Sequence, residues 1–293
     1  MKMSVKKKSI PFGDILIYGG LFLLMLVILF PMIYIISISF SDTGAVSRGE
    51  VVLLPVEFNL DAYRYVFKDA RFARAYGNSV FYAAGSTAAS VLLTGLIAYP
   101  LSVEGFSGRK PLTILLMITM FFGGGMIPTY MVIKNLGLLD NPLVMMLPGA
   151  ISAYNVIIYR TFFQNIPPAL REAAYIDGAG HFKIFRKVIL PLSKPLLATM
   201  SLFAIVGSWN SYFDALIYLN DSRMHPLSLY LRQLIVNMDM SSQGMRDIMV
   251  QMDVNPRTIR AATMIVAMLP IMCVYPFLQK YFASGVMIGS VKG

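Results

Sequence analysis

A run of 26 uncharged residues, 15–40, constrains the fold more than any other feature of the sequence. The hydrocarbon core of a bilayer requires a helix of about 20 apolar residues, so this run predicts a membrane-spanning helix. A cleavable signal peptide is the competing interpretation, but its apolar region has roughly 7–15 residues and precedes a small-residue cleavage site. The run is longer than that, and small residues form no clear cleavage site. We therefore expect a retained first helix.

The composition extends this interpretation to the whole chain. Of the 293 residues, 57% are hydrophobic and only 14% are charged, whereas soluble domains have roughly 45–50% apolar residues. We expect an all-α polytopic membrane protein with six spans, near residues 15–40, 75–103, 111–133, 141–159, 195–220 and 261–279. An even number of spans places both termini on the same side of the membrane.

The distribution of charge indicates which side that is. With a cytoplasmic N-terminus, the inner segments hold fourteen of the 25 cations and four of the 15 anions, so the net charge of +10 lies on one face. The positive-inside rule assigns such a face to the cytoplasm. Both termini are therefore expected in the cytoplasm, and the basic balance needs no nucleic acid to explain it.

Residues 166–191 form the one stretch in which polar residues follow an ordered helical pattern. Pro167 and Pro168 end the preceding helix and can occupy the first turn of the next, where proline loses no hydrogen bond. Gly178 stands where a helix C-terminus favours a residue that tolerates a left-handed conformation. The first helix has Leu170, Ala173, Ala174 and Asp177 at helical spacing; the second has Phe182, Phe185, Val188 and Ile189 on one side, Lys183, Arg186 and Lys187 largely on the other, and ends at Leu190 and Pro191. We expect a helix-turn-helix on the membrane surface, with a basic face that suits anionic membrane lipid.

Enzymatic motifs are missing from the sequence. It has no phosphate-binding loop, no serine-nucleophile elbow and no zinc-binding helix of the usual spacings. The two histidines, His181 and His225, fall on opposite sides of the expected membrane, and Cys273 is the only cysteine. We expect neither a catalytic residue nor a metal site. An intramembrane enzyme would need a paired nucleophile and base or paired acids within the spans, and the sequence has none. A stand-alone channel or secondary transporter would usually need its own ion-pathway residues, whereas Asp214 and Arg260 are nearly the only charges near membrane depth.

The hairpin also carries a resemblance. Glu172, Ala173 and Ala174, followed at fixed spacing by Gly178 and then by Val188-Ile189-Leu190-Pro191, resemble the EAA loop of permease subunits of ATP-binding-cassette importers. The family prefers isoleucine where Val188 stands. The resemblance implies that this loop docks into a cleft of a cytoplasmic ATPase subunit. The residues it implies for coupling to the ATPase are Glu172, Ala173, Ala174, Asp177, Gly178, Leu190 and Pro191.

The resemblance covers nearly the whole chain after the first helix. The segments FFGGGMIPTY, SWNSYFDALIYLND and GVMIGSVKG are similar to the six-helix permease subunits of bacterial carbohydrate importers, in the branch that handles larger or acidic saccharides such as alginate. The resemblance implies a non-catalytic subunit of the inner membrane that pairs with a homologous permease. It also implies two ATP-binding cassette subunits, which hold the ATP and Mg, and an extracytoplasmic saccharide-binding protein. A permease of the same family for another sugar or small solute is the alternative.

Three regions follow from this organisation. Residues 1–74 hold a cytoplasmic tail, the first span and an outer segment; residues 75–282 hold the permease core with hairpin 166–191 and outer loop 221–257; residues 283–293 form a cytoplasmic tail. Gly285 and Gly289 argue against a helix in that tail, which resembles tails inserted between ATPase subunits. In the resembling maltose importer the outer loop reaches the binding protein, so Ser241, Ser242, Gln243 and Gly244 are the contact residues expected here.

Candidate residues for the substrate pathway lie on the third and fifth spans. Asp214 is an acidic residue in an apolar span, and such residues usually face a bundle interior or water. Asn210 precedes it by four residues, so the two share a helical face. Alternatively, Asp214 marks the outer end of the helix. The expected pathway residues are Trp209, Asn210, Tyr212, Phe213, Asp214 and Gly124. The alternative role of the aromatics is packing or anchoring at the membrane interface. The alternative role of Gly124 and its glycine neighbours is a kink or close helix packing.

Overall fold

The fold is described from a computed structural model, which covers residues 12–240 and 255–290. The chain divides into two compact units, residues 1–68 with 235–266 and residues 69–234 with 267–293. Within the described residues all regular structure is helical, and no strand is present. The expectation of an all-α fold is therefore confirmed for this part of the chain.

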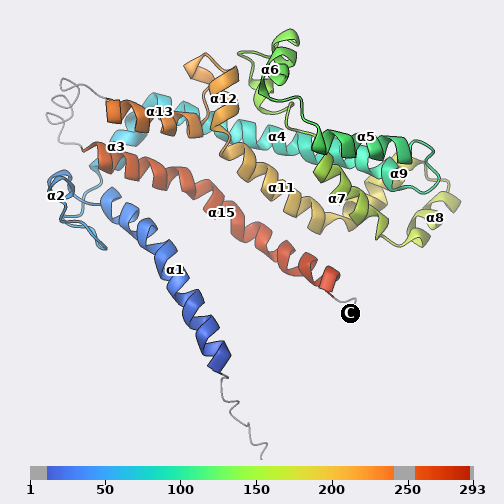
Figure 1. The fold of residues 1–293 in the computed structure, drawn as a ribbon, viewed down its shortest axis with the longest axis horizontal. Coiled ribbons are helices and arrows are strands. Elements are labelled where there is room, and N and C mark those ends of the chain that lie inside the picture. The colour runs from blue at the N-terminus through green and yellow to red at the C-terminus, as the bar shows by residue number, and fades with distance from the viewer. Residues whose placement is uncertain (1–11, 241–254, 291–293) are drawn as a thin grey trace, which may run out of the picture. The chain divides into compact units, whose positions relative to one another are not determined.

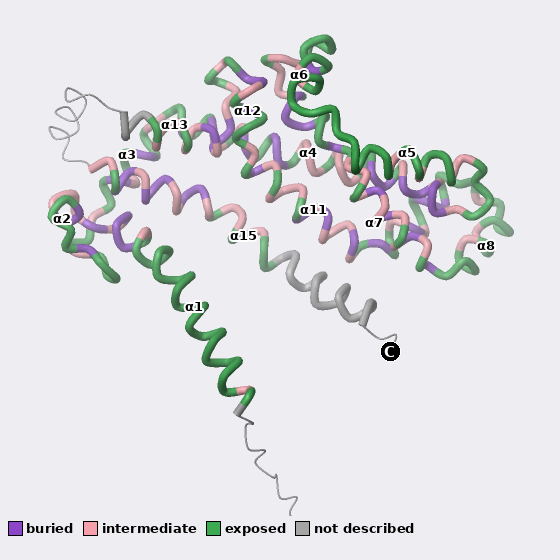
Figure 2. Tube along the Cα trace, in the orientation of Figure 1, coloured by how far each residue is buried: buried purple, intermediate pink, exposed green. Residues whose placement is uncertain are grey.

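The first unit contains α1 (Phe12–Ser39), α2 (Thr43–Arg48), α3 (Asp61–Lys68) and the start of α15 (Pro256–Ser290). The apolar side chains of α1 are exposed along most of its length, as Figure 2 shows. A small core forms only at its C-terminal end, where Ile38 packs with residues of α2, the following loop and α15: Ala45, Val46, Val51 and Ala261. Exposed apolar surface of this extent is expected where lipid replaces water as the solvent.

The second unit is built around the 33-residue helix α4 (Ala70–Ser102). The other elements are α5 (Arg109–Phe121), α6 (Met126–Asn135), η1 (Pro142–Met145), α7 (Ala153–Gln164), α8 (Pro168–Ile176), α9 (His181–Ile184), η2 (Phe185–Ile189), α10 (Leu190–Leu192), α11 (Lys194–Trp209), α12 (Tyr212–Tyr218), η3 (Ser222–Met224) and α13 (Leu227–Met240), of which the end of α13 belongs to the first unit. Its largest core joins α4, α7, η2 and α11 through buried side chains such as Tyr99, Tyr159, Phe163, Ile189 and Met200.

The six expected spans are not all found as continuous helices in the described residues. Three helices there are long and apolar enough to cross a membrane, Gly13–Ser39, Ala70–Ser102 and Pro256–Pro276, and the number is five if each of two bent helix pairs forms one span. The expected span 141–159 is not found: a short η1 is followed by a loop, and α7 begins only at Ala153. Pro142 and Pro148 explain the interruption, because proline removes a helical hydrogen bond and disfavours helix in the residue before it.

One bent pair falls in the third expected span, and the other joins the hairpin to the fifth. Helices α5 and α6 meet at 118°, and Gly125, with φ +78°, lies at the junction. Segment His181–Leu192 meets Lys194–Trp209 at 81°. A further break follows Trp209, so the fifth expected span 195–220 consists of α11 and the separate short helix α12.

The expectation of a non-helical C-terminal tail is wrong for the described residues, since α15 continues to Ser290 through Gly285 and Gly289. A glycine costs a helix only about 1 kcal/mol, and extending an existing helix adds a hydrogen bond for each residue without a new nucleation step. Residues Ser241, Ser242, Gln243 and Gly244 lie outside the described residues.

Asp140 joins two loops of the second unit. It adopts a left-handed backbone with φ +54°, and its N–H donates to the carbonyl of Tyr218 at 3.0 Å. Its carboxylate accepts hydrogen bonds from the side chain of Asn220 at 3.0 Å, from the Asn220 amide and from the Asp221 amide at 3.2 Å. These bonds, chiefly those from Asn220, hold the pKa of Asp140 below its usual value.

We expect this junction to open at acid pH. A depressed folded-state pKa stabilises the junction above the ordinary aspartate value of about 3.9, and this stabilisation is lost as the pH falls through the folded-state pKa. The measurement is the hydrogen-exchange protection of the Asn220 and Asp221 amides across pH, corrected for the intrinsic exchange rate. The Asp61 amide, which donates to the non-titrating side chain of Asn59, serves as the control. Equal changes in protection at both places would contradict the prediction.

Candidate functional site

A cavity of about 460 Å³ lies within the second unit, among α4, α6, η1, α7, α11 and α12. Its polar lining consists of hydroxyl, amide and carboxylate side chains from Ser86, Ser90, Thr129, Asn155, Ser208, Ser211, Asp214 and Tyr218. Apolar side chains such as Ile133, Met145 and Phe203 complete the wall. Hydroxyl groups both donate and accept hydrogen bonds, so such a wall suits a polyhydroxylated ligand.

The hydroxyl of Ser208 is the least satisfied group of this wall. Its Oγ is buried and has no hydrogen-bond partner among the described residues. In contrast, Ser211 Oγ donates to the Asp214 carboxylate at 2.7 Å. A buried polar group without a partner is destabilising by about 1–3 kcal/mol, so its retention calls for an explanation. Ser208 lines the cavity, so a rotation of its side chain would bring the buried hydroxyl into contact with a ligand hydroxyl there.

We expect Ser208→Ala to lower substrate uptake about three- to tenfold while leaving the thermal stability of the protein unchanged or raised. The alanine removes a ligand-binding hydroxyl and also a buried polar atom that lacks a partner. Uptake in vesicles and thermal denaturation of the purified complex measure the two effects. Ser201→Ala, also on α11 but outside the cavity wall, is the matched control. If uptake by Ser208→Ala equals that of the control, Ser208 does not bind substrate.

Of the expected pathway residues Asn210 and Asp214, only Asp214 lines this cavity. Asp214 lies in the first turn of α12. The prediction that Asn210 and Asp214 share a helical face is wrong, because the helix breaks between them. The Asn210 side-chain amide instead donates to the Val206 carbonyl at 2.9 Å. Spacing of four residues places two side chains together only within one continuous helix.

The expected aromatic and glycine positions do not line this cavity. Trp209 is buried, donates from its indole nitrogen to the Ala267 carbonyl at 3.2 Å and packs edge-on against Tyr76. Trp209 thus packs within the unit, which agrees with the alternative role for the aromatics, and its place in the substrate pathway stays a prediction. Tyr212 and Phe213 are exposed, and the Arg232 guanidinium lies over the Tyr212 ring. Gly124 is exposed in the break between α5 and α6.

The stretch 166–191 forms a helix-turn-helix. Pro168 is the first residue of α8, and Gly178 has φ +72° just after its C-terminus, as the sequence predicts. The Gly178 amide donates to the Tyr175 carbonyl and the Ala179 amide to the Ala174 carbonyl, both at 2.9 Å. Across the turn, the Tyr175 hydroxyl lies 2.7 Å from His181 Nδ1. These contacts fix the angle between the two short helices.

The hairpin has an outward face and an inward face. The exposed residues include Glu172, Ala173, Asp177, Gly178 and Pro191, whereas Ala174 and Leu190 pack against the buried core. Helix α8 begins at Pro168, so Glu172 lies in its second turn rather than in the first turn near the positive end of the helix dipole. Glu172 forms no hydrogen bond or ion pair with another described residue. Its carboxylate is therefore available to a partner.

The second helix of the hairpin differs in register from the expectation. Residues Phe185–Ile189 form a π turn, and Ile184 and Ile189, five residues apart, are both fully buried. Phe182, expected on the apolar side with Phe185, is 68% exposed. An α-helical reading misplaces these side chains because a π turn bonds residues five apart.

Arg171 is a residue that the sequence reasoning missed. Its guanidinium donates to the carbonyl of Ser102, the last residue of α4, at 3.3 Å and to the carbonyl of Phe163 in α7. Arginine presents several donors in one rigid fork, so a single side chain can bond both helix ends. Arg171 therefore ties α8 to two helices of the core, one residue away from Glu172.

Comparison with known proteins shows the family. The family described as "Binding-protein-dependent transport system inner membrane component" matches residues 85–288. The chain belongs to this family. This binding-protein-dependent permease is 45% identical over 284 residues, 96% of this chain and 98% of the relative, to the polygalacturonan/rhamnogalacturonan transport system permease protein of Bacillus subtilis. The arabinooligosaccharides transport system permease protein of Halalkalibacterium halodurans is 28% identical and covers 99% of the permease and 100% of the relative.

A solved structure resembles the permease closely. It is a chain of a bacterial ABC transporter involved in the import of the acidic polysaccharide alginate, with a TM-score of 0.87 and 35% identity, covering 92% of this permease and 96% of that chain. A chain of an alginate ABC transporter in complex with an alginate pentasaccharide-bound periplasmic protein has a TM-score of 0.56 and 16% identity, which shows the fold alone. The family resemblance drawn from the hairpin motif is thus confirmed.

Proposed function

We propose that this chain forms half of the translocation pathway of an ATP-driven importer for uronate-containing oligosaccharides. The observation that carries the proposal is the 45% identity, across nearly the whole chain, to a polygalacturonan/rhamnogalacturonan permease. The 35% identity to a chain of the alginate importer supports the same chemical class. A neutral sugar is the alternative substrate for a permease of this family, and a stand-alone secondary transporter is the alternative mechanism.

The cavity supports a saccharide ligand. Its hydroxyl and amide side chains match the hydroxyl groups of a sugar, while its lining includes one carboxylate, Asp214, and no lysine or arginine. A uronate carboxylate beside Asp214 would be repelled, since like charges placed together are costly. The substrate carboxylates would therefore face the homologous partner permease, while this chain binds the hydroxyl edge of the sugar.

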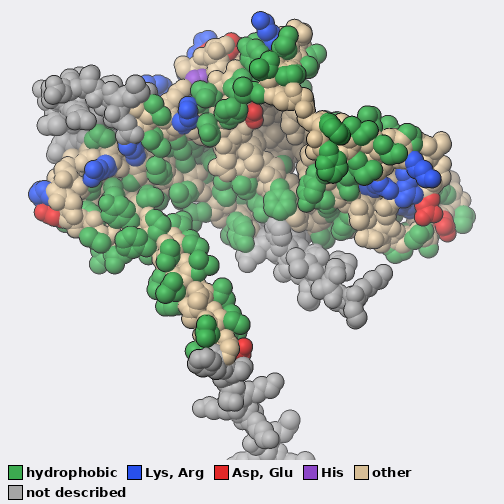
Figure 3. All heavy atoms as spheres, in the orientation of Figure 1, with side chains coloured by type: hydrophobic (Ala, Val, Ile, Leu, Met, Phe, Trp, Pro, Cys, Tyr) green, Lys and Arg blue, Asp and Glu red, His purple; other side chains and the backbone are tan. Residues whose placement is uncertain are grey.

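The charges support an orientation in the bacterial inner membrane. Lysine and arginine side chains gather over the end of the second unit that carries α5 and α9, as Figure 3 shows. By the positive-inside rule this end faces the cytoplasm. The opposite end, with η3 and α13, would face the extracytoplasmic saccharide-binding protein. The charge count along the sequence, with fourteen cations and four anions in the inner segments, supports a cytoplasmic location of both termini.

Coupling would pass through the hairpin. Glu172, Ala173, Asp177, Gly178 and Pro191 present an exposed face, which suits docking onto one of the two ATP-binding cassette subunits. Those subunits would hold the ATP and Mg, and this chain would hold no cofactor and perform no covalent chemistry. The loop containing Ser241–Gly244 would contact the binding protein, and the C-terminal end of α15 would contribute to the ATPase interface.

A panel of saccharides tests the substrate class. With the complete complex and its binding protein in vesicles, we expect oligogalacturonate to stimulate ATP hydrolysis at least tenfold more than a neutral oligosaccharide of equal length. An oligogalacturonate whose carboxyl groups have been reduced to primary alcohols keeps the ring hydroxyls and the chain length but lacks the charges. It is the matched control. Equal stimulation by charged and reduced chains would refute the acidic class. Full activity of the purified chain without an ATPase would refute the importer mechanism.

A further inference from the structure

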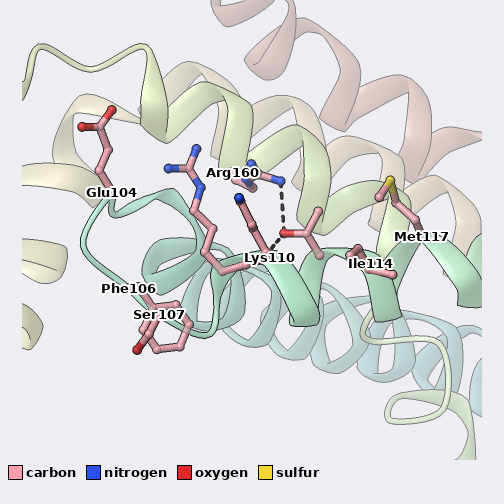
Figure 4. Close-up of a pocket in the computed structure, with 9 residues that line it drawn as sticks. Glu104, Phe106, Ser107, Lys110, Ile114, Met117 and Arg160 are labelled. Carbon is pink, nitrogen blue, oxygen red and sulfur yellow. Dashed lines mark hydrogen bonds between the residues drawn. The ribbon is translucent and has the colours of Figure 1, made fainter.

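A second cavity of about 680 Å³ lies apart from the polar one, among the loop after α4, residues 109–117 of α5 and Arg160 of α7 (Figure 4). Three cations line it, Arg109, Lys110 and Arg160, with one carboxylate, Glu104. In Figure 4 the Glu104 carboxylate lies away from Lys110 and Arg160. The cavity thus has an excess of positive charge.

None of these cations forms an ion pair with a carboxylate of the described residues. The four ion pairs found there involve other arginines. Arg160 is held by a hydrogen bond from its Nη1 to Thr113 Oγ1 at 3.2 Å, and Thr113 Oγ1 donates to the Arg109 carbonyl at 2.6 Å. The Arg160 Nε is buried without a partner. Positioned guanidinium donors with no carboxylate partner form a site for an anion with several acceptor oxygens, such as a phosphate.

The other wall of the same cavity is apolar. Ile114 and Met117 of α5 line it, and they are 52% and 41% exposed. Along the same helix, Leu115 and Ile118 are 56% and 48% exposed, so the apolar wall continues onto the surface of α5 (Figure 3). A small anion or an acidic peptide would leave this wall uncovered. A molecule with an anionic head and apolar chains would cover both walls.

The position along the chain agrees with such a ligand. Arg109 begins α5, the first helix of a bent pair that is apolar enough to cross a membrane together with α6. Cations at the end of a spanning helix lie at the level of lipid headgroups, and basic pockets between helices there bind anionic lipids. We propose that this cavity binds the headgroup phosphate of one anionic phospholipid, whose acyl chains lie along α5.

The test titrates phosphatidylglycerol into the delipidated importer complex and counts bound lipids by native mass spectrometry. We expect Arg109→Gln/Lys110→Gln/Arg160→Gln to weaken retention of one phosphatidylglycerol at least tenfold, and Ile114→Ser/Met117→Ser to weaken it as well. The triple variant Lys68→Gln/Lys134→Gln/Lys194→Gln removes the same charge outside the cavity and is expected to behave like the wild type. Should the first triple variant fail to fold, Lys110→Glu at the exposed lysine gives the same readout.

Competitors distinguish the sources of the anion. Glycerophosphate, the head without chains, is expected to displace the lipid at least a hundredfold less well than phosphatidylglycerol, and phosphatidylcholine with the same chains is expected not to be retained. If glycerophosphate displaced the bound lipid as well as phosphatidylglycerol does, the cavity would be a site for free phosphate, and the proposal would be overturned. Displacement by oligogalacturonate would assign the cavity to the saccharide pathway instead. Unchanged retention in the triple variant, or equal loss in the control, would also overturn it.

Discussion

Substitution of Gly178 by leucine is expected to abolish substrate-stimulated ATP hydrolysis and uptake, with reductions of at least tenfold, while membrane insertion remains intact. Gly178 has φ +72°, and a left-handed backbone costs a residue with a side chain about 1–2 kcal/mol. No atom lies within 4 Å of a side-chain carbon added at this position. Leucine would therefore project outward from the exposed face of the hairpin and separate it from the proposed ATPase partner. ATPase retention on purified membranes and uptake in vesicles are the measurements.

Two other variants separate backbone strain from obstruction of the partner. Gly137→Leu introduces the same strain at φ +68°, also into open space, but on the loop after α6, and we expect it to keep ATPase binding. Gly178→Asn places a side chain that tolerates the left-handed conformation, and we expect a smaller loss than with leucine. Equal losses for Gly137→Leu and Gly178→Leu would remove Gly178 from the docking face.

Substitution of Arg171 by methionine is expected to uncouple ATP hydrolysis from transport. Methionine keeps much of the length and the helix propensity of arginine but removes the hydrogen bonds to the carbonyls of Ser102 and Phe163. A hydrogen bond to a charged group contributes roughly 1.5–3 kcal/mol. Without these bonds, α8 would stay on the ATPase but would no longer transmit its movement to α4 and α7.

The readouts for Arg171 separate coupling from assembly. We expect the methionine variant to retain the ATPase and hydrolyse ATP, with uptake reduced more than tenfold and faster amide exchange across α8. Arg171→Lys keeps the charge but not the rigid fork, so its uptake should fall between wild type and methionine. Normal uptake by the methionine variant would show that the hairpin acts without this connection.

The sequence predicts local features of the hairpin better than its packing. Pro168 and Gly178 appear where expected, because helix ends depend on residues within a few positions. The position of Phe182 differs from the expectation, because the π turn follows from burial of Ile184 and Ile189 against the core rather than from local propensity. Arg171 was missed for a similar reason, since both of its acceptors lie in other helices. The one signal in the sequence was the position of Arg171 directly before the small residues of α8, where a long side chain can reach neighbouring helices.

The spans show the same division between local and tertiary causes. The glycines after Phe122 predicted a break, and a 118° bend is found there. The relation of Asn210 to Asp214 assumed a continuous helix, whereas the chain turns after Trp209, where the indole bonds to the Ala267 carbonyl. A contact between residues 58 positions apart does not appear in the local periodicity of apolar residues from which helices are predicted. Length and hydropathy therefore identify candidate spans but not where each one breaks.

The break between α5 and α6 has a consequence for the fate of the chain in the cell. The amides of Gly123 and Gly124 donate no hydrogen bond to another described residue, and Phe121 and Phe122 beside them are 81% and 77% exposed. Backbone amides are tolerated at membrane depth only where protein or water covers them. A copy made without its companions would therefore present this segment to the quality-control proteases of the membrane. Its abundance should follow the synthesis of the partner subunits rather than its own.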